Sequence, residues 1–163
     1  KKEQIFIMLG GSDTASLSLD IVYALKDVII KKTIVSNNLN IVNSLKNHQN
    51  IEVLYKPSDE QLIKTMASSV AAISTASMGA YELAYFKIPT IIVAVAKNQE
   101  IGVSQFIRHN LASGSIFINN NEWKTDIKNK IEHILQQKNR YTDNAISNDG
   151  TDNIVNEVLG LIQ

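Results

Sequence analysis

The chain has 163 residues, of which 44% are hydrophobic and 20% are charged, and its 16 basic and 16 acidic residues cancel. This is the composition of one ordinary globular domain, and a neutral chain without a basic stripe argues against a nucleic-acid partner. Cysteine is absent, which excludes disulfides, thiolate metal sites and a cysteine nucleophile. No apolar run reaches the ~20 residues of a membrane span and no secretory signal is recognisable, so we expect no membrane span and a cytoplasmic location.

Apolar strands and amphipathic helices alternate along the whole chain. Short apolar runs predict strands at residues 4–9, 32–36, 51–55, 70–74, 90–95 and 115–118. Helices are expected between them and at residues 154–162, and the expected helix caps are Ser12 or Asp13, Ser58, Ser77 and Asn121. The alternation predicts an α/β fold, namely a Rossmann-like parallel sheet of about six strands with helices on both faces.

In open parallel sheets, ligands bind beyond the carboxyl ends of the strands. Four loops begin at such ends, at Gly10, Tyr55, Ser74 and Ala96. In the first of them, "LGGSD", the glycines Gly10 and Gly11 precede Ser12. Glycine permits close backbone approach, so this loop either admits a ligand near a helix N-terminus or is a tight turn with a capping side chain.

The loop "STASMGAYE" joins a buried strand to a helix through small residues. The free N–H groups and the dipole of a helix N-terminus favour an anion such as phosphate, and Ser77, Gly79 and Ala80 leave room for it. Glu82 lies further into the helix, where its charge would repel a phosphate, so a neutral partner such as a ribose diol suits it better. The alternative is an exposed carboxylate and an ordinary N-cap at Ser77.

Two further loops carry groups that can form hydrogen bonds. The neutral amides of Asn98 and Gln99 suit sugar hydroxyls or phosphate oxygens, although a solvated loop explains them equally well. The turn at Lys56-Pro57 offers backbone groups to a base. Because all four loops follow strands at the same end of the predicted sheet, we expect them to converge.

The histidines and the tryptophan lie away from these loops. His48, His109 and His133 occur among polar and charged residues and are expected at the surface, with no metal-ligating pair at helical spacing. Trp123 begins a helix and is expected to pack against the core. We therefore expect neither a metal nor a cofactor.

Together these residues resemble the C-terminal half of a glycosyltransferase-B-type protein. The resemblance is to the UDP-sugar hydrolase of pseudaminic acid biosynthesis and its relatives in spore-coat polysaccharide biosynthesis. It rests on G-G-S-D after the first strand, on Glu82 seven residues before Pro89 and an apolar strand, on the pair Asn98-Gln99, and on a closing D-G followed by an apolar helix. The order and spacing of these motifs extend over nearly the whole chain.

The resemblance implies a UDP-binding domain and assigns a role to each group of residues. It implies that Glu82 binds the ribose hydroxyls and that Ser77, Met78, Gly79 and Ala80 bind the pyrophosphate. It places Gly10, Gly11 and Ser12 beside the phosphates, Asn98 and Gln99 on the sugar-diphosphate side, and Tyr55, Lys56 and Pro57 at the uracil. The pyrophosphate loop of the family is richer in glycine, so we expect the side chains of Thr75, Ala76 and Met78 to narrow the site or block it.

In that family the catalytic histidine lies in an N-terminal half that has no counterpart here. The chain begins Lys1-Lys2-Glu3 and enters a strand almost at once, so we expect residues 1–163 to be one nucleotide-binding domain of a longer two-domain protein. The implied function is the UDP-binding C-terminal domain of a hydrolase acting on UDP-2,4-diacetamido-2,4,6-trideoxy-altropyranose. The implied partners are UDP or a UDP-sugar and a missing N-terminal domain or partner subunit. The alternatives are half of a glycosyltransferase and a non-catalytic interaction module.

Overall fold

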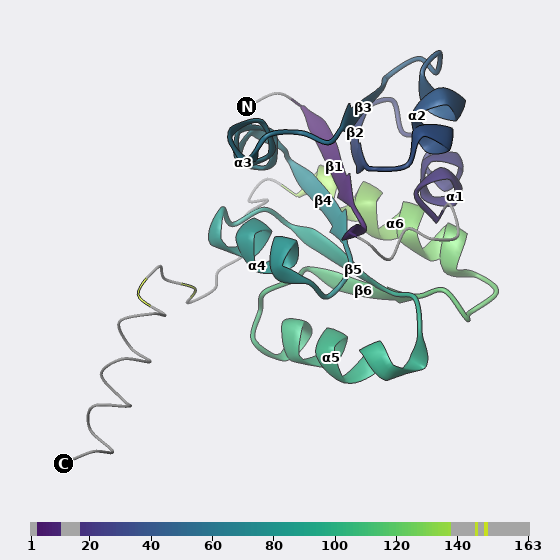
Figure 1. Cartoon of the computed structure of the whole chain (residues 1–163). Coiled ribbons are helices and arrows are strands. Elements are labelled where there is room, and N and C mark those ends of the chain that lie inside the picture. The colour runs from purple at the N-terminus through teal and green to yellow at the C-terminus, as the bar shows by residue number, and fades with distance from the viewer. Residues whose placement is uncertain (1–2, 11–16, 138–145, 147–148, 150–163) are drawn as a thin grey trace.

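The computed structural model describes residues 3–10, 17–137, 146 and 149, which form a six-stranded parallel sheet covered by helices (Figure 1). The strands are β1 (Gln4–Met8), β2 (Lys31–Ser36), β3 (Ile51–Tyr55), β4 (Ala71–Ser74), β5 (Thr90–Ala94) and β6 (Gly114–Phe117). The helices are α1 (Leu17–Ala24), α2 (Leu39–Leu45), α3 (Asp59–Ser68), α4 (Met78–Tyr85), α5 (Glu100–Arg108) and α6 (Trp123–Gln136). Gly11, Ser12, Asp13 and the helix expected at residues 154–162 lie outside the described residues.

The helices form two layers, one on each face of the sheet (Figure 1). One face packs against α1, α2 and α6 through a large apolar cluster that includes Ile5, Ile21 and Ile131. The other face packs against α3, α4 and α5 through two smaller clusters, centred on Phe6 and Phe106. Both faces of the sheet are therefore buried, which accounts for the continuous apolar runs of the strands and confirms the predicted fold.

The strand order is β3-β2-β1-β4-β5-β6. The chain adds β2 and β3 on one side of β1 and then returns to add β4, β5 and β6 on the other side, so the strand order reverses between β1 and β4. Met8 and Ser74, the last residues of these two strands, are paired across them. Side chains alternate between the faces along β1: Ile5 and Ile7 belong to the α1–α6 side, whereas Phe6 and Met8 pack on the α3–α4 side. The switch point of the sheet is therefore bordered by the carboxyl ends of β1 and β4.

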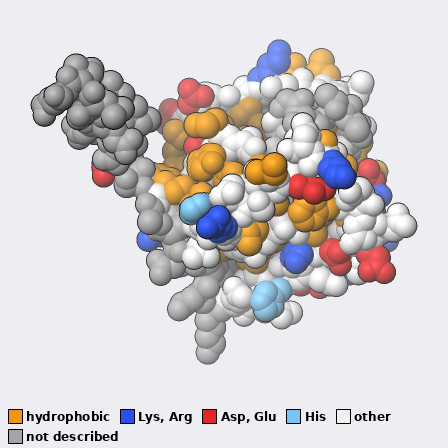
Figure 2. Space-filling view, turned by 90° about the horizontal axis from the view of Figure 1, so that it is seen from below, with side chains coloured by type: hydrophobic (Ala, Val, Ile, Leu, Met, Phe, Trp, Pro, Cys, Tyr) orange, Lys and Arg blue, Asp and Glu red, His pale blue; other side chains and the backbone are white. Residues whose placement is uncertain are grey.

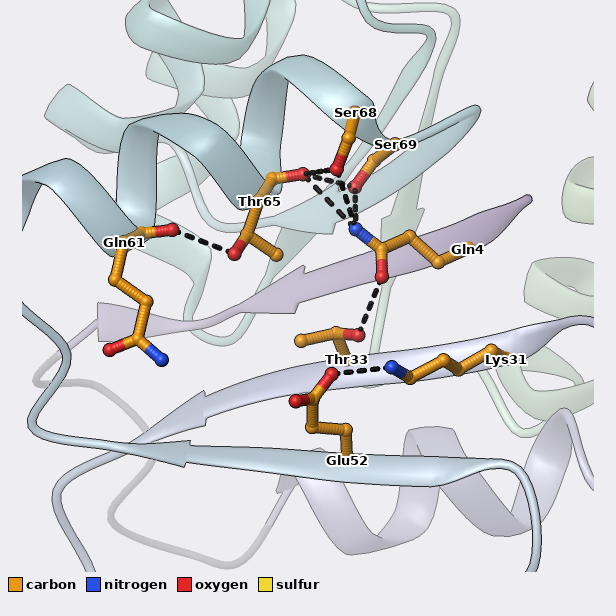
Figure 3. Close-up of polar contacts among 8 residues, drawn as sticks. All are labelled: Gln4, Lys31, Thr33, Glu52, Gln61, Thr65, Ser68 and Ser69. Carbon is orange, nitrogen blue, oxygen red and sulfur yellow. Dashed lines mark hydrogen bonds and ion pairs between the residues drawn. The ribbon is translucent and has the colours of Figure 1, made fainter. Parts of the chain in front are cut away.

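A buried polar network fixes the opposite, amino end of the sheet (Figure 3). Gln4 is 3% exposed, and its Nε2 donates to the hydroxyl of Ser68 at 2.9 Å while its Oε1 accepts from the hydroxyl of Thr33 at 3.0 Å. The network links β1 to β2 and to the end of α3. No buried side-chain nitrogen or oxygen of the described residues lacks a partner, as burial of polar groups requires.

Of the expected helix caps, Ser58 is confirmed and Asn121 is wrong, while Ser77 occupies the N-cap position of α4 without a side-chain capping bond. The hydroxyl of Ser58 accepts from the N–H of Gln61 at 3.3 Å and caps α3. Asn121 does not cap α6, because that helix begins at Trp123 with Glu122 at the cap position, and it is Asn120 whose Oδ1 accepts from the Glu122 N–H at 3.0 Å.

Trp123 packs partly buried against the large apolar cluster, as expected. The three histidines are exposed, also as expected. Across the ranges that the structure describes, none of the helices combines the length and the apolar character needed to cross a membrane.

Candidate functional site

The loops that follow β1 and β4 are joined directly by hydrogen bonds. The hydroxyl of Ser74 donates to the carbonyl of Met8 at 3.0 Å, and the hydroxyl of Thr75 lies 3.4 Å from the carbonyl of Leu9. Ser74 and Thr75 are buried, so both side chains hold the two loops together instead of projecting into the space beyond them.

Gly10 begins the loop after β1 in a conformation that favours glycine. Its φ of +63° lies in the left-handed region, and no atom lies within 4 Å of the position that a Cβ would occupy. The backbone can therefore turn sharply here and leave open space beside it. The two neighbours predicted to share this role, Gly11 and Ser12, lie outside the described residues.

The first turn of α4 has no side-chain cap. Ser77 occupies the N-cap position, but its hydroxyl is oriented toward the carbonyl of Thr75 at 3.4 Å and makes no capping bond to the helix. In α2 and α3, by contrast, Asn38 and Ser58 accept a hydrogen bond from a first-turn N–H. The N–H groups of Met78 and Gly79 are thus left for water or an external anion, whereas that of Ala80 donates to the Ser77 carbonyl at 3.0 Å.

Glu82 turns back toward this first turn. Its Oε2 lies 4.0 Å from the position that a Cβ on Gly79 would occupy, although the residue as a whole is exposed. The carboxylate thus stands beside the helix N-terminus at the switch point. The carboxylate can accept hydrogen bonds from hydroxyl groups, and the free N–H groups of the helix start can bind an anion. Together they can hold an anion that also carries hydroxyl groups.

The side chain that occupies the space above Gly79 is that of Met8. A Cβ on Gly79 would lie only 2.0 Å from the Cε of Met8. We expected side chains of the loop after β4 to narrow the site, but Thr75 is buried and Met78 is 75% exposed. The side chain that restricts the space is instead that of Met8. Met8 was expected to be an ordinary strand residue, and its position near the end of an apolar run, two residues before Gly10, is the only signal in the sequence.

The loop after β5 approaches the same region through α5. Gly102 lies so close to the preceding loop that a Cβ on it would be 3.7 Å from the Cβ of Ala76. Asn98 is exposed, whereas the Oε1 of Gln99 accepts from the N–H of Val95 at 2.9 Å and closes the loop. Gln99 thus has a structural role that its sequence position did not indicate, and only its amide nitrogen remains for a ligand.

The turn after β3 lies further along the sheet. Because β2 separates β3 from β1, Tyr55, Lys56 and Pro57 are not neighbours of Gly10 in the sheet. Lys56 has a left-handed φ of 45°, and its Nζ lies 5.3 Å from the centre of the Tyr55 ring. The structure thus brings together the loops after β1, β4 and β5, and places the fourth predicted loop at the same edge but two strands away.

One hollow borders the loop after β5, and another lies well away from the site. One of about 30 Å³ lies between the loop after β5 and the end of β6, lined in part by Lys97, Glu100 and Asn119. The other, of about 550 Å³, lies at the outer edge of the sheet beside Lys31 and Glu52, which pair at 2.5 Å (Figure 3). No group of three His, Asp or Glu side chains able to hold a metal ion occurs in the described part of the chain.

Figure 2 looks onto the side of the molecule on which α5 lies, and hydrophobic side chains gather in the middle of this view. The exposed large hydrophobic residues of α4 and α5 are Met78, Tyr81, Tyr85, Ile101 and Ile107. The ring of Tyr81 also packs on that of Phe106, with their centres 4.6 Å apart, so α4 and α5 form one continuous surface. A gathering of this kind is typical of a surface that contacts another polypeptide.

Comparison with known proteins shows the fold. No protein-family model matches the chain, and no curated protein matches it in sequence. Among solved structures, it is similar to UDP-GlcNAc 2-epimerase of Methanocaldococcus jannaschii in complex with UDP-GlcNAc and UDP (TM-score 0.69, 11% identity, covering 98% of this chain and 46% of that one). It is also similar to S. aureus MnaA with UDP (TM-score 0.72, 11% identity, 99% and 45%) and to LpCGTa in complex with UDP (TM-score 0.61, 11% identity, 84% and 34%).

The chain thus has the Rossmann-like α/β fold of glycosyltransferase-B-type enzymes. It spans less than half the length of each of these three neighbours. At these identities the similarity concerns the fold, and function has to be argued from the site.

Proposed function

We propose that this chain is the UDP-binding half of a glycosyltransferase-B-type enzyme. The observation that carries the proposal is the position of the Glu82 carboxylate beside the uncapped first turn of α4, at the point where the strand order reverses between β1 and β4. Open α/β sheets bind their ligands at such a switch point. The presence of UDP in three structural neighbours supports the choice of nucleotide.

The diphosphate would bind at the first turn of α4. The N–H groups of Met78 and Gly79 follow the uncapped Ser77, and together with the helix dipole they offer the positive end that an anion requires, while Ala80, whose N–H donates to the Ser77 carbonyl at 3.0 Å, would contribute the small size of its side chain. Gly10 would let the loop after β1 approach the phosphates, with Gly11 and Ser12 completing it. These contacts come from the backbone, which explains why small residues occur here.

Glu82 would accept hydrogen bonds from the ribose hydroxyls. A carboxylate accepts two such bonds readily, and a neutral diol avoids the repulsion that a phosphate would suffer. Asn98 and the amide nitrogen of Gln99 would lie on the sugar-diphosphate side. The turn formed by Tyr55, Lys56 and Pro57 would meet the uracil, the end of the nucleotide furthest from α4.

In the whole enzyme we propose hydrolysis of a UDP-sugar, with UDP-2,4-diacetamido-2,4,6-trideoxy-altropyranose as the candidate substrate. A base from a second half would take a proton from water, and the water oxygen would bond to the anomeric carbon while the bond from that carbon to the diphosphate breaks. This chain would hold the departing UDP and stabilise its negative charge at the α4 N-terminus. Transfer of the sugar to a hydroxyl acceptor is the alternative outcome of the same binding mode.

The second half, either another domain or a partner subunit, would face the carboxyl edge of the sheet. The chain covers 46% of the M. jannaschii epimerase, and Met78 and Ile101, each 75% exposed, lie at the starts of α4 and α5 on this side. Burial of such side chains would contribute to the association. The purified chain alone should bind UDP and hydrolyse no UDP-sugar.

A ¹⁵N-NMR titration with UDP, GDP and dTDP tests the binding proposal. We expect UDP to shift the amides of Gly10, of residues 77–80 and of Asn98. Glu82→Gln should weaken UDP binding about tenfold, because a charged acceptor is replaced by a neutral one, and should weaken 2′-deoxy-UDP binding less.

Glu132→Gln is the matched control, because Glu132 lies on α6 and α6 covers the other face of the sheet. If none of the three nucleotides shifts these amides in a folded sample, UDP binding is refuted and a non-catalytic interaction module becomes the better description.

A further inference from the structure

The contact between Met8 and Gly79 joins the end of β1 to the first turn of α4. A Cβ on Gly79 would lie 2.0 Å from the Cε of Met8 and 3.7 Å from its Sδ, so the terminal methyl group lies directly against the glycine backbone. Gly79 is buried, whereas Met8 is only partly buried against the cluster around Phe6. The methyl group thus fills the space that the missing side chain leaves.

An anion bound at the first turn of α4 would lie next to this space. The Cα–Cβ direction in a helix tilts toward the N-terminus, so the Met8 methyl lies on the N-terminal side of Gly79, the side on which the unpaired first-turn N–H groups point. The Oε2 of Glu82 lies 4.0 Å from the same Cβ position. The Met8 methyl group and the Glu82 carboxylate thus both lie next to Gly79, where we propose that the diphosphate binds.

We propose that Met8 sets the affinity and selectivity of this site, because its ε-methyl group competes with a diphosphate for the surface of Gly79. This inference rests on the proposed function. A methionine side chain is unbranched and flexible, so it can rotate away from Gly79 without movement of the backbone. A nucleotide with a diphosphate has to displace the methyl group, whereas a nucleoside without phosphates does not.

Met8→Leu is the variant that isolates this effect. Leucine keeps the apolar volume that packs against the Phe6 cluster but ends one atom earlier, so the atom that touches Gly79 is removed while the core is preserved. We expect the Kd for UDP to decrease about fourfold, which corresponds to the burial of one methyl group. The Kd for uridine should be unchanged. Met8→Ala, which removes more of the side chain, should show the same preference for the diphosphate.

A second measurement observes Met8 itself. The chain has three methionines, so ¹³C-methyl labelling gives three signals, and Met66, which is 0% exposed, serves as the internal reference. Addition of UDP to the 163-residue chain should shift the Met8 methyl signal strongly and the Met66 signal little, while uridine should leave both in place. The signals are assigned with the Met8→Leu and Met78→Leu variants.

The outcomes separate the two proposals. If UDP binds the parent chain but Met8→Leu binds it equally or more weakly, and the Met8 methyl signal stays in place, Met8 is a fixed part of the core and this inference is overturned while UDP binding stands. If neither the parent chain nor either variant binds UDP, both are refuted.

Discussion

The hydroxyl of Ser74 donates a hydrogen bond to the main-chain carbonyl of Met8 at 3.0 Å, joining the last residues of the two strands at the switch point. The residues that directly follow these strands are linked in the same way, because the hydroxyl of Thr75 donates to the carbonyl of Leu9. Hydroxyl-bearing residues at the end of β4 therefore anchor the β1 loop, and the small-residue stretch has a structural role in addition to the proposed binding role.

Replacement of Ser74 by alanine should lower the free energy of unfolding by about 1 kcal/mol, because one buried hydrogen bond is lost and the Met8 carbonyl loses a partner. Denaturant unfolding followed by circular dichroism measures this. Ser104→Ala is the control, since the hydroxyl of Ser104 makes an exposed bond to the Ile101 carbonyl within α5 and its loss should change stability by less than about 0.5 kcal/mol. Equal effects at the two positions would contradict the anchoring role.

Gly79→Ala tests the contact with Met8 through a double-mutant cycle on stability. In the parent chain the new Cβ would collide with the Met8 methyl group, so the usual gain of about 0.5–1 kcal/mol from replacing a helical glycine should be lost or reversed. In the Met8→Ala background the gain should reappear.

The matched control for that cycle is Gly102→Ala in α5, where a Cβ would meet the Ala76 side chain at an ordinary 3.7 Å. Gly102→Ala should stabilise the protein by the same ~0.5–1 kcal/mol in both backgrounds. If Gly79→Ala behaves like Gly102→Ala in the parent chain, Met8 does not restrict this position.

Thr33→Val should destabilise the protein by about 1–3 kcal/mol, because the Oε1 of the buried Gln4 is left without its donor. The double variant Gln4→Leu/Thr33→Val should recover part of this loss, since no unpaired polar atom then remains. Thr65→Val removes an exposed hydroxyl bond to the Gln61 carbonyl and serves as the control. Additive effects of Gln4→Leu and Thr33→Val in urea unfolding would show that the two side chains do not act as a pair.

Lys32 should give the stability a dependence on alkaline pH. Burial lowers the pKa of its ammonium group below the ordinary 10.5, and the nearby Asp27 opposes this only in part. Between the lowered pKa and 10.5 the unfolded chain binds more protons than the folded one, so the free energy of unfolding should rise with pH in that window and be independent of Lys32 below it.

The measurement for Lys32 is urea unfolding at a series of pH values from 7 to about 10.5. The Lys32→Met variant should lack the rise. Lys26→Met should retain it, because Lys26 is exposed, although it lies only two residues before Val28, whose carbonyl accepts from the Lys32 ammonium. Identical pH profiles for the parent chain and Lys32→Met would contradict the effect of burial.

The sheet and its helices were predictable because both faces are buried. The central strands β1, β4 and β5 are largely apolar, and the six predicted strands coincide with β1 to β6 to within one residue at either end. The capping hydroxyl of Ser58 was also predictable, since the bond to Gln61 is local in sequence. Asn121 was misassigned because the turn before α6 offers several neighbouring polar residues, and the sequence does not indicate that the helix begins only at Trp123.

The contacts across the switch point were not predictable from the sequence. The proximity of Met8 to Gly79 depends on the pairing of β1 with β4, and a single sequence contains no signal for which strands are neighbours. The same holds for Gln4, a polar residue at the start of an apolar run whose partners lie on β2 and α3. The bond from the Val95 N–H to Gln99 is local, but an amide that closes a loop and an amide that meets a ligand have the same sequence signal.

The pairing of β1 with β4 also determines when the proposed site can form during synthesis. Ser74 and Met8 are 66 residues apart, so β1, β2 and β3 leave the ribosome before β4 is available, and one edge of β1 stays open meanwhile. An open strand edge is a template for pairing with other chains. A protein split between α3 and β4 would therefore give two pieces, each with an unpaired edge and neither with a complete site, and nucleotide binding would report that both had docked.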